Sequence, residues 1–457
     1  MINRAKARAA IRLLRTQHHH TSNAVWATLE YFSYPILMIM ATPLLVSYLG
    51  VDQYGLWVLV NSFAGMSGVS NLGMGTAVMK FVSARRGQGD QVEAARVVQI
   101  CLAMSLAGGI VFSSLMALMT PYLAQKVFHK MGPINRTIIA MFCGAALVLL
   151  YQLDNLYTQA IKATERFDVA AYIEIGYRFT LLFSTVVVAW IYRSLFPVLV
   201  VTIIIVALVI VCKAFSASKI FHASLYVPYW SKTTAREVFK FGFWSWSQGI
   251  AGVVFQQADR IILGAFLGSS SLAYYNVCMQ LARQVHSLPA AAMSVVFPLV
   301  SRTKEESGLD ALRSIRDAFL IVNYLFAFVL AGLLFFWGQE ILIIWMGKAF
   351  AMEAGYLLSW LVLPFFLLSL CIVPFNFLLG YGEVRFVSSN SIVSGFIGVI
   401  SAFVLVPGYG PVGAALSRVA YASVALLAYL KLYGRGSLGP ISTKACSREE
   451  ALLRQKL

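Results

Sequence analysis

Long runs of apolar residues, separated by short polar segments, recur along the whole chain. A helix of about 20 mostly apolar residues spans the hydrocarbon core of a bilayer. The predicted membrane helices cover residues 25–49, 54–82, 97–120, 134–160, 172–192, 195–217, 238–265, 271–300, 317–337, 355–380, 384–406 and 411–433. The pattern therefore predicts an all-α integral membrane protein with about 12 transmembrane helices.

The composition excludes other structural classes. Of the 457 residues, 59% are hydrophobic and only 12% are charged, and the mean hydropathy is +0.75. A soluble chain carries roughly 25% charged residues, and an outer-membrane barrel alternates polar and apolar positions. The six cysteines are scattered singly, with no CxxC pair and no metal-ligand spacing. We interpret them as packing residues and expect neither a metal nor a cofactor.

Basic residues predict the orientation of the chain in the membrane. The net charge is +17, from 36 Lys and Arg against 19 Asp and Glu. With residue 1 in the cytoplasm, the inner segments carry about 27 Lys and Arg and the outer loops about five, as the positive-inside rule requires. The inner count includes Lys162 and the stretch from Lys213 to Lys240. Both termini are therefore expected in the cytoplasm, and no removable signal peptide is predicted.

The two halves of the chain resemble each other. A shift of 218 residues, from Gly50 to Gly268, places residues 48–50 (YLG) on 266–268 (FLG) and Val78 on Val296. Because each half begins in the cytoplasm and has six spans, the repeats are related by an axis along the membrane normal, and rocking of one bundle against the other gives alternating access. The expected units are a basic cytoplasmic N-terminal segment (1–24), a six-helix bundle (25–217), a cytoplasmic linker (218–237), a second six-helix bundle (238–433) and a cytoplasmic tail (434–457).

Short motifs resemble those of polysaccharide exporters. Residues 48–57 (YLGVDQYGLW) and 71–77 (NLGMGTA) resemble the opening of the polysaccharide-export branch of the multidrug/oligosaccharidyl-lipid/polysaccharide exporter superfamily. Residues 256–264 (QQADRIILG) are similar to the seventh-helix signature of Wzx-type repeat-unit flippases. Further matches are 297–298 (FP), 345–347 (WMG) and 409–415 (YGPVGAA). The resemblance covers roughly residues 25–433, nearly the whole chain.

The resemblance implies a fold, a location and a function. The fold is two parallel six-helix bundles around a central cavity (MATE-like), and the location is the bacterial inner membrane. The function is that of a flippase, which moves an undecaprenyl-pyrophosphate-linked oligosaccharide to the periplasmic leaflet for O-antigen, capsule or exopolysaccharide synthesis. The implied partners are this lipid-linked oligosaccharide, membrane lipids, a polysaccharide polymerase and glycosyltransferases, and nucleic acid is not expected.

Ionisable residues inside the spans are candidate functional residues, because a charge in the bilayer is costly unless it is paired or faces water. Arg283 ranks first, since a guanidinium is permanently charged and binds phosphate in a bidentate manner. It shares a polar helix face with Asn276 and Gln280, which is expected to line the cavity. Structural pairing of Arg283 is the alternative. The other predicted substrate-binding residues lie on the helix 238–265: Gln248, Gln256, Asp259 and Arg260. For Asp259, pairing with an arginine of a neighbouring helix is equally compatible with the sequence.

A second set of charged residues is predicted to act in ion coupling or gating. Glu174 and Arg178 are four residues apart on one helix, which favours an ion pair. Asp154 is either an interhelical partner of that pair or a site for a cation or proton. Glu30, near the inner entrance, and Arg418, near the outer one, either guide the substrate or cap a helix.

Other functions are compatible with parts of the sequence. We expect no enzyme, because the predicted outer loops offer no acid/base pair and the chain has no GxxxxGK[ST] phosphate loop. A cation- or proton-coupled multidrug exporter would favour a cavity dominated by carboxylates, whereas the intramembrane charges here are balanced, with four acidic and four basic residues. A flippase of the peptidoglycan precursor, lipid II, shares the diphosphate carrier and remains the third alternative.

Overall fold

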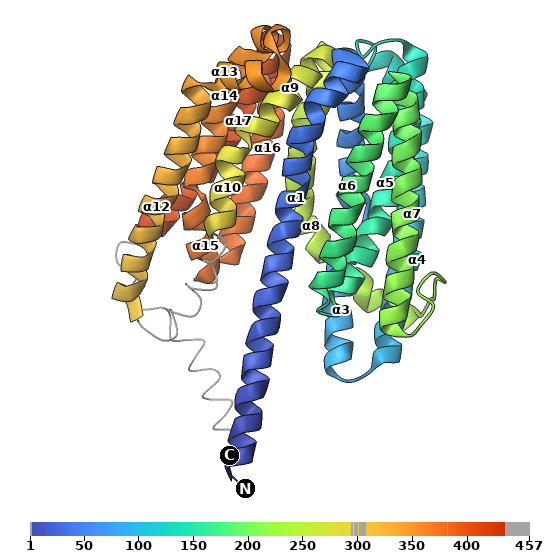
Figure 1. The fold of residues 1–457 in the computed structure, drawn as a ribbon, viewed down its shortest axis with the longest axis vertical. Helices are drawn as coiled ribbons and strands as arrows, with labels where there is room; N and C mark the ends of the chain where they lie inside the picture. The colour runs from blue at the N-terminus through green and yellow to red at the C-terminus, as the bar shows by residue number, and fades with distance from the viewer. Residues whose placement is uncertain (1, 294–295, 297–299, 301–307, 382, 435–457) are drawn as a thin grey trace.

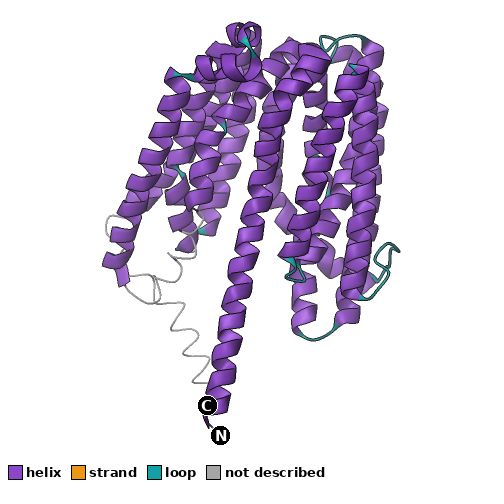
Figure 2. Cartoon of the chain, viewed as in Figure 1, coloured by secondary structure: helices purple, strands orange, loops and turns teal. Residues whose placement is uncertain are grey.

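The computed structural model describes residues 2–293, 296, 300, 308–381 and 383–434. Within these residues the chain forms helices and connecting loops without any strand, which confirms the all-α prediction (Figure 2). Helices α3–α7 lie on one side of the molecule and α9, α10 and α12–α17 on the other, with α1 and α8 between them (Figure 1).

The first half of the chain contains seven helices. They are α1 (Ile2–Gly65), α2 (Ser67–Ser70), α3 (Met74–Gly87), α4 (Gln91–Lys126), α5 (Ile134–Lys162), α6 (Phe167–Tyr192) and α7 (Leu195–Phe221). The second half contains α8 (Lys232–Leu267), α9 (Ser269–Ala282), α10 (Gln284–Ala292), α12 (Gly308–Phe336), α13 (Gly338–Met346), α14 (Lys348–Leu370), α15 (Ile372–Gly380), α16 (Val384–Tyr409), α17 (Pro411–Ala425) and α18 (Leu427–Gly434).

The predicted spans correspond to helices of the structure. Nine helical stretches among the described residues are long and apolar enough to cross a membrane, so this is a multi-pass membrane protein. One of them, Thr28–Ser70, joins the first predicted span to most of the second. The predicted span 238–265 corresponds to α8, which carries many polar residues, and the predicted span 271–300 corresponds to the shorter helices α9 and α10. These three helices are not among the nine candidate membrane spans.

Equivalent positions of the internal repeat adopt the same local structure. Gly50 has φ 78° and ψ 162°, and Gly268 has φ 88° and ψ −172°, so the backbone turns in nearly the same way at both positions. A positive φ favours glycine, which has no Cβ. Val78 and Val296 are both fully buried. The repeat thus places two similar turns at one end of the molecule, while the exact bounds of the two bundles stay a prediction.

The two halves pack closely beside these turns, at the end predicted to face outward. A Cβ on Gly55 would lie only 1.9 Å from the carbonyl oxygen of Ser269, so the two backbones are in direct contact there. Asp52 Oδ1 accepts hydrogen bonds from Ser269 Oγ at 3.0 Å and from Ser270 Oγ at 2.5 Å. Lys130 Nζ donates to the carbonyl oxygen of Phe266 at 3.0 Å. These contacts hold the halves together at this end.

Candidate functional site

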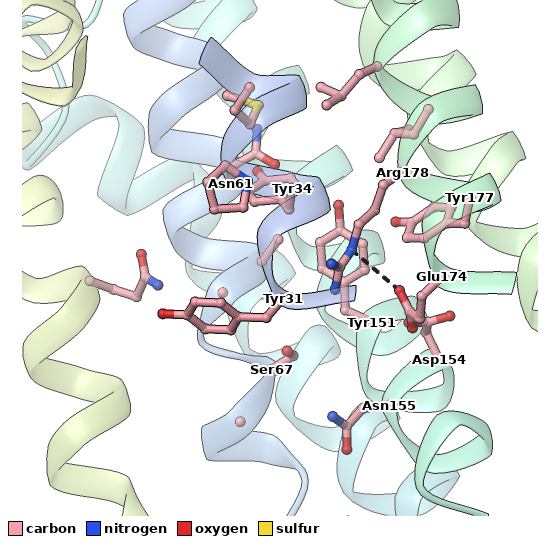
Figure 3. Close-up of a pocket in the computed structure, with 18 of the residues that line it drawn as sticks. Tyr31, Tyr34, Asn61, Ser67, Tyr151, Asp154, Asn155, Glu174, Tyr177 and Arg178 are labelled. Carbon is pink, nitrogen blue, oxygen red and sulfur yellow. Dashed lines mark ion pairs between the residues drawn. The ribbon is translucent and has the colours of Figure 1, made fainter. Parts of the chain in front are cut away.

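A cavity of about 910 Å³ lies between the two halves of the chain. Residues of α1, α2, α5, α6 and α7 form one wall, and residues of α8, α9 and α10 form the other. Figure 3 shows part of the first wall, where side chains from several helices surround one space. A volume of this size falls within the range of small-molecule and cofactor sites, roughly 300–1,000 Å³.

Two arginines line the wall formed by α8, α9 and α10. The Arg260 side chain makes only long contacts, with Nη1 3.5 Å from Gln257 Oε1 and Nη2 4.0 Å from Met279 Sδ, and its buried Nε has no hydrogen-bond partner among the described residues. Arg283 lies at the junction of α9 and α10, and its exposed side chain forms neither a hydrogen bond nor an ion pair with another described residue. Both guanidinium groups are therefore available to an anion in the cavity.

The polar face of α9 and α10 lines the cavity, as the helical spacing predicts. Asn276, Gln280 and Arg283 all belong to its lining. Tyr54 Oη of α1 accepts hydrogen bonds from Gln280 Nε2 at 3.0 Å and from Asn276 Nδ2 at 3.3 Å. Gln280 Oε1 also accepts one from Thr42 Oγ1 at 3.0 Å. These two amides connect the halves of the protein, and their part in substrate binding stays a prediction.

Asp259 and Arg418 do not lie where the sequence analysis expected them. Asp259 was predicted to bind the substrate, and Arg418 was predicted to lie near the outer entrance. They are not among the residues that line the cavity, and both are buried. Asp259 Oδ2 accepts hydrogen bonds from Arg418 Nε at 2.8 Å and from Tyr275 Oη at 2.6 Å. The pairing of Asp259 with an arginine of a neighbouring helix is thus the arrangement found, because two buried charges compensate each other.

Gln256 and Gln248 are the two remaining residues of α8 that were predicted to bind the substrate. Gln256 is exposed and is not among the lining residues. Gln248 belongs to a stretch of α8 whose side chains lie outside the described part of the structure. Among the predicted substrate-binding residues of this helix whose side chains are described, only Arg260 lines the cavity.

The opposite wall contains a cluster of buried charges that the sequence analysis missed in part. Lys213 Nζ of α7 lies 2.5 Å from Asp154 Oδ1 of α5 and 2.6 Å from Glu174 Oε1 of α6. It also donates to Thr158 Oγ1 at 2.9 Å. The sequence analysis counted Lys213 among the basic residues of the inner segments and did not predict its burial, whereas only 1% of its side chain is exposed. The two carboxylates stabilise an ammonium group at this depth. The position of Lys213 within a strongly apolar run of the sequence was the signal that could have predicted its burial.

The other charged residues of this wall are also paired. Arg178 Nε lies 3.6 Å from Glu174 Oε2, as the four-residue spacing predicts, and Figure 3 marks this ion pair. The Arg178 guanidinium also donates to the carbonyl oxygen of Glu30 and, at 3.1 Å, to Ser33 Oγ. Glu30 Oε1 lies 2.8 Å from Lys162 Nζ. Lys162, counted above among the basic residues of the inner segments, ends α5 and lines the cavity, where it is paired with this carboxylate of α1.

The distribution of charge follows from these contacts. Every carboxylate that lines the cavity has a basic partner, and Arg260 and Arg283 remain on the opposite wall without a carboxylate partner among the described residues. In the same part of the chain, no group of three or more His, Cys, Asp or Glu is placed to hold a metal ion. The cavity therefore has a surplus of positive charge on the wall formed by α8, α9 and α10.

A family model and a bacterial relative each match most of this chain. The model of a family described as "Polysaccharide biosynthesis protein" matches residues 44–352. A protein of Shigella flexneri named "Putative O-antigen transporter" is 22% identical over 406 residues, which cover 86% of this chain and 93% of the relative.

Solved structures share the fold. The lipid II flippase MurJ in an inward closed conformation has a TM-score of 0.71 at 13% identity, covering 90% of this chain and 87% of MurJ. An inward-facing multidrug resistance transporter of the MATE family in the MOP superfamily has a TM-score of 0.67 at 13% identity, covering 89% of this chain and 98% of the transporter. These likenesses confirm the predicted MATE-like fold, and the proteins matched are named as transporters and flippases.

Proposed function

This chain belongs to the polysaccharide biosynthesis protein family, and from that premise we propose that it is a flippase for undecaprenyl-pyrophosphate-linked oligosaccharide repeat units. The protein lies in the bacterial inner membrane with both termini in the cytoplasm and supplies O-antigen, capsule or exopolysaccharide synthesis. It acts by alternating access and is not an enzyme. The coverage of the Shigella flexneri relative supports this class of function.

One observation carries the proposal: Arg260 and Arg283 line the cavity, and neither side chain has a carboxylate partner among the described residues. A diphosphate carries negative charge that a planar guanidinium can bind through two parallel hydrogen bonds. Unpaired positive charge inside a membrane protein is costly, so its presence in a cavity points to an anionic ligand. The diphosphate of the carrier lipid is such a ligand.

The same charges argue against a multidrug exporter. A site for cationic drugs needs carboxylates that are free to bind them, and here Glu30, Asp154 and Glu174 each have a basic partner. Coupling of a cation or proton to Asp154 or Glu174 would require Lys213 to leave first, because its ammonium group occupies the space between the two carboxylates. We therefore assign these residues to the support of the cavity wall, with Lys213 as a competitor for any coupling ion.

The cavity opens toward the cytoplasm in our proposal. The direct backbone contact of Gly55 with Ser269, at the end predicted to face outward, supports an inward-facing state. From this state the saccharide diphosphate enters, Arg260 and Arg283 hold the anion, and the lipid tail stays in the bilayer. Rocking of the two bundles then releases the saccharide on the other side.

The test uses cells that lack this chain but keep their glycosyltransferases. We expect a lipid-linked saccharide to accumulate in the cytoplasmic leaflet, measured by mass spectrometry and by accessibility from each side. The wild-type chain should reverse the accumulation, Arg283→Ala should not, and Arg283→Lys should do so in part. Arg136→Gln, at an exposed position outside the cavity, is the matched control.

Two results would contradict the proposal. Normal export by both Arg283→Ala and Arg283→Lys would remove that residue from the substrate site. Absence of any accumulation, together with increased sensitivity to cationic drugs, would assign the protein to the multidrug branch instead.

A further inference from the structure

The wall opposite the two arginines is aromatic. Four tyrosines from three helices line the cavity there: Tyr31 and Tyr34 of α1, Tyr151 of α5 and Tyr177 of α6. Figure 3 shows the four rings beside one space. Tyr31 is 51% exposed and Tyr34 44% exposed, although both line an internal cavity. The two rings therefore present open surface to whatever occupies the cavity.

Charged groups of the same wall hold two of these rings. The guanidinium of Arg178 lies 5.9 Å from the centre of the Tyr34 ring, and Lys213 Nζ lies 5.6 Å from the centre of the Tyr177 ring. Such cation–π contacts favour one position of the ring. Because Arg178 and Lys213 are themselves fixed by Glu174, the rings are oriented by the buried charge cluster. This arrangement gives the aromatic wall a defined shape before a ligand binds.

Amide groups lie next to the rings. Asn61 and Asn155 line the same wall. Asn61 Nδ2 donates to the carbonyl oxygen of Trp57 at 2.8 Å, and its own Oδ1 accepts no hydrogen bond from another described residue. Asn155 Oδ1 accepts from Asn71 Nδ2 at 3.3 Å, which leaves the Asn155 NH₂ group for the cavity. The wall thus combines flat apolar faces with neutral hydrogen-bonding groups.

This combination selects the chemical class of the ligand. A pyranose ring has an apolar face of C–H groups that stacks on an aromatic ring, and hydroxyl groups around its edge that bond to amides and to the tyrosine hydroxyl. A lipid tail gains nothing from amides. A cation would need a free carboxylate, and Asp154 and Glu174 are paired with Lys213. A neutral, polyhydroxylated ligand fits the wall best.

We propose that this tyrosine wall is the saccharide subsite of the cavity. Sugar rings stack on Tyr31 and Tyr34 while Arg260 and Arg283, on the opposite wall, hold the diphosphate of the same molecule. The inference rests on the proposed function and divides its substrate into two parts, each bound by one half of the chain. Affinity for the saccharide and affinity for the diphosphate are then separable by mutation.

The experiment measures binding to the full-length protein in lipid nanodiscs with two probes. The first probe is farnesyl diphosphate, which has the diphosphate and no sugar. The second is the lipid-linked saccharide extracted from cells that lack this chain. We expect the double variant Tyr31→Ala/Tyr34→Ala to bind the second probe about tenfold more weakly, equal to about 1.4 kcal/mol, and the first probe as the wild type does. Arg283→Gln should weaken the binding of both probes.

Two control variants show whether a loss of affinity is specific to the cavity-facing rings. The double variant Tyr31→Phe/Tyr34→Phe retains the rings and should keep most of the affinity for the saccharide. Normal binding of farnesyl diphosphate by the alanine variant excludes misfolding as the cause of its loss. Tyr172→Ala removes an exposed tyrosine of α6 that does not line the cavity, and should bind both probes normally.

Each contrary result has its own meaning. If the alanine variant binds both probes more weakly to the same extent, or binds both normally, the saccharide subsite is refuted while the diphosphate site stands. The same holds if the saccharide adds no affinity in the wild type. If the wild type binds neither probe, the proposed function itself fails, and the subsite with it.

Discussion

Replacement of Lys213 by methionine tests the buried charge cluster, because it removes the ammonium group and keeps most of the side-chain volume. Lys213 Nζ lies within 2.6 Å of a carboxylate oxygen of both Asp154 and Glu174, and 1% of its side chain is exposed. The variant therefore leaves two carboxylates in the wall of the cavity without the charge that they share.

The structure sets the expected size of the effect. Removal of one partner from a buried ion pair costs about 3–5 kcal/mol, because the other charge is left uncompensated. Glu174 keeps a second partner, Arg178, at 3.6 Å, and the Asp154 side chain is 14% exposed and retains contact with water. We therefore expect Lys213→Met to lower the free energy of unfolding by about 3 kcal/mol, the lower end of that range.

The same geometry predicts which second mutation restores stability. Arg178 remains beside Glu174, so Asp154 is the carboxylate that loses its compensation. Asp154→Asn should then restore more stability to the Lys213→Met protein than Glu174→Gln does, and a double-mutant cycle measures the difference.

The assay is unfolding of the detergent-solubilised protein by sodium dodecyl sulfate, followed by circular dichroism. Lys219→Met is the matched control, since this lysine lies on the same helix, is exposed, and has its Nζ 4.4 Å from the centre of the Phe215 ring without an ion pair to any described residue. It should change stability by less than about 1 kcal/mol. If Lys213→Met is as stable as this control, or if Glu174→Gln restores more than Asp154→Asn, the charge cluster does not have the energetics inferred from its geometry.

Two further predictions concern other parts of the molecule. Arg418→Ala leaves Asp259, which is 1% exposed, as an uncompensated buried charge and should lower the free energy of unfolding by about 3–5 kcal/mol in the same assay. Addition of Asp259→Asn should restore part of the loss, and a fully stable single variant would contradict the pairing. Gly55→Ala places a Cβ 1.9 Å from the Ser269 carbonyl oxygen, so it should open the end predicted to face outward and increase labelling of cysteines introduced there. Gly87→Ala, with no atom within 4 Å of the added Cβ, should leave the labelling unchanged, and equal labelling of both variants would show that the contact does not close that end.

Much of the fold was predictable because it depends on local patterns. Apolar runs long enough to cross a bilayer correspond to helices of the structure, and the weak repeat correctly paired Gly50 with Gly268, whose backbone angles match. The ion pair of Glu174 with Arg178 also followed from spacing, since residues four apart on a helix are neighbours.

The candidate site was less predictable because its contacts join helices that are distant in the sequence. Lys213 is 59 residues from Asp154, and a rule that counts basic residues near helix ends assigns it to the cytoplasm. Asp259 is 159 residues from Arg418, so the periodicity of one helix did not reveal which charge compensates it. The cavity-facing tyrosines gave no distinct signal, as aromatic residues are common throughout this chain.

The position of the tyrosines and the arginines on opposite halves has a consequence for exchanging parts of the chain. The two halves resemble each other in sequence and in one turn, yet α1, α5 and α6 carry the tyrosines while α8 and the α9–α10 junction carry the arginines. In the proposed division of labour, one half of the chain binds the diphosphate of the carrier lipid and the other half binds the glycan. A chimaera joined within residues 218–237 to the first half of a relative with another glycan would then change the glycan preference and keep the anion site.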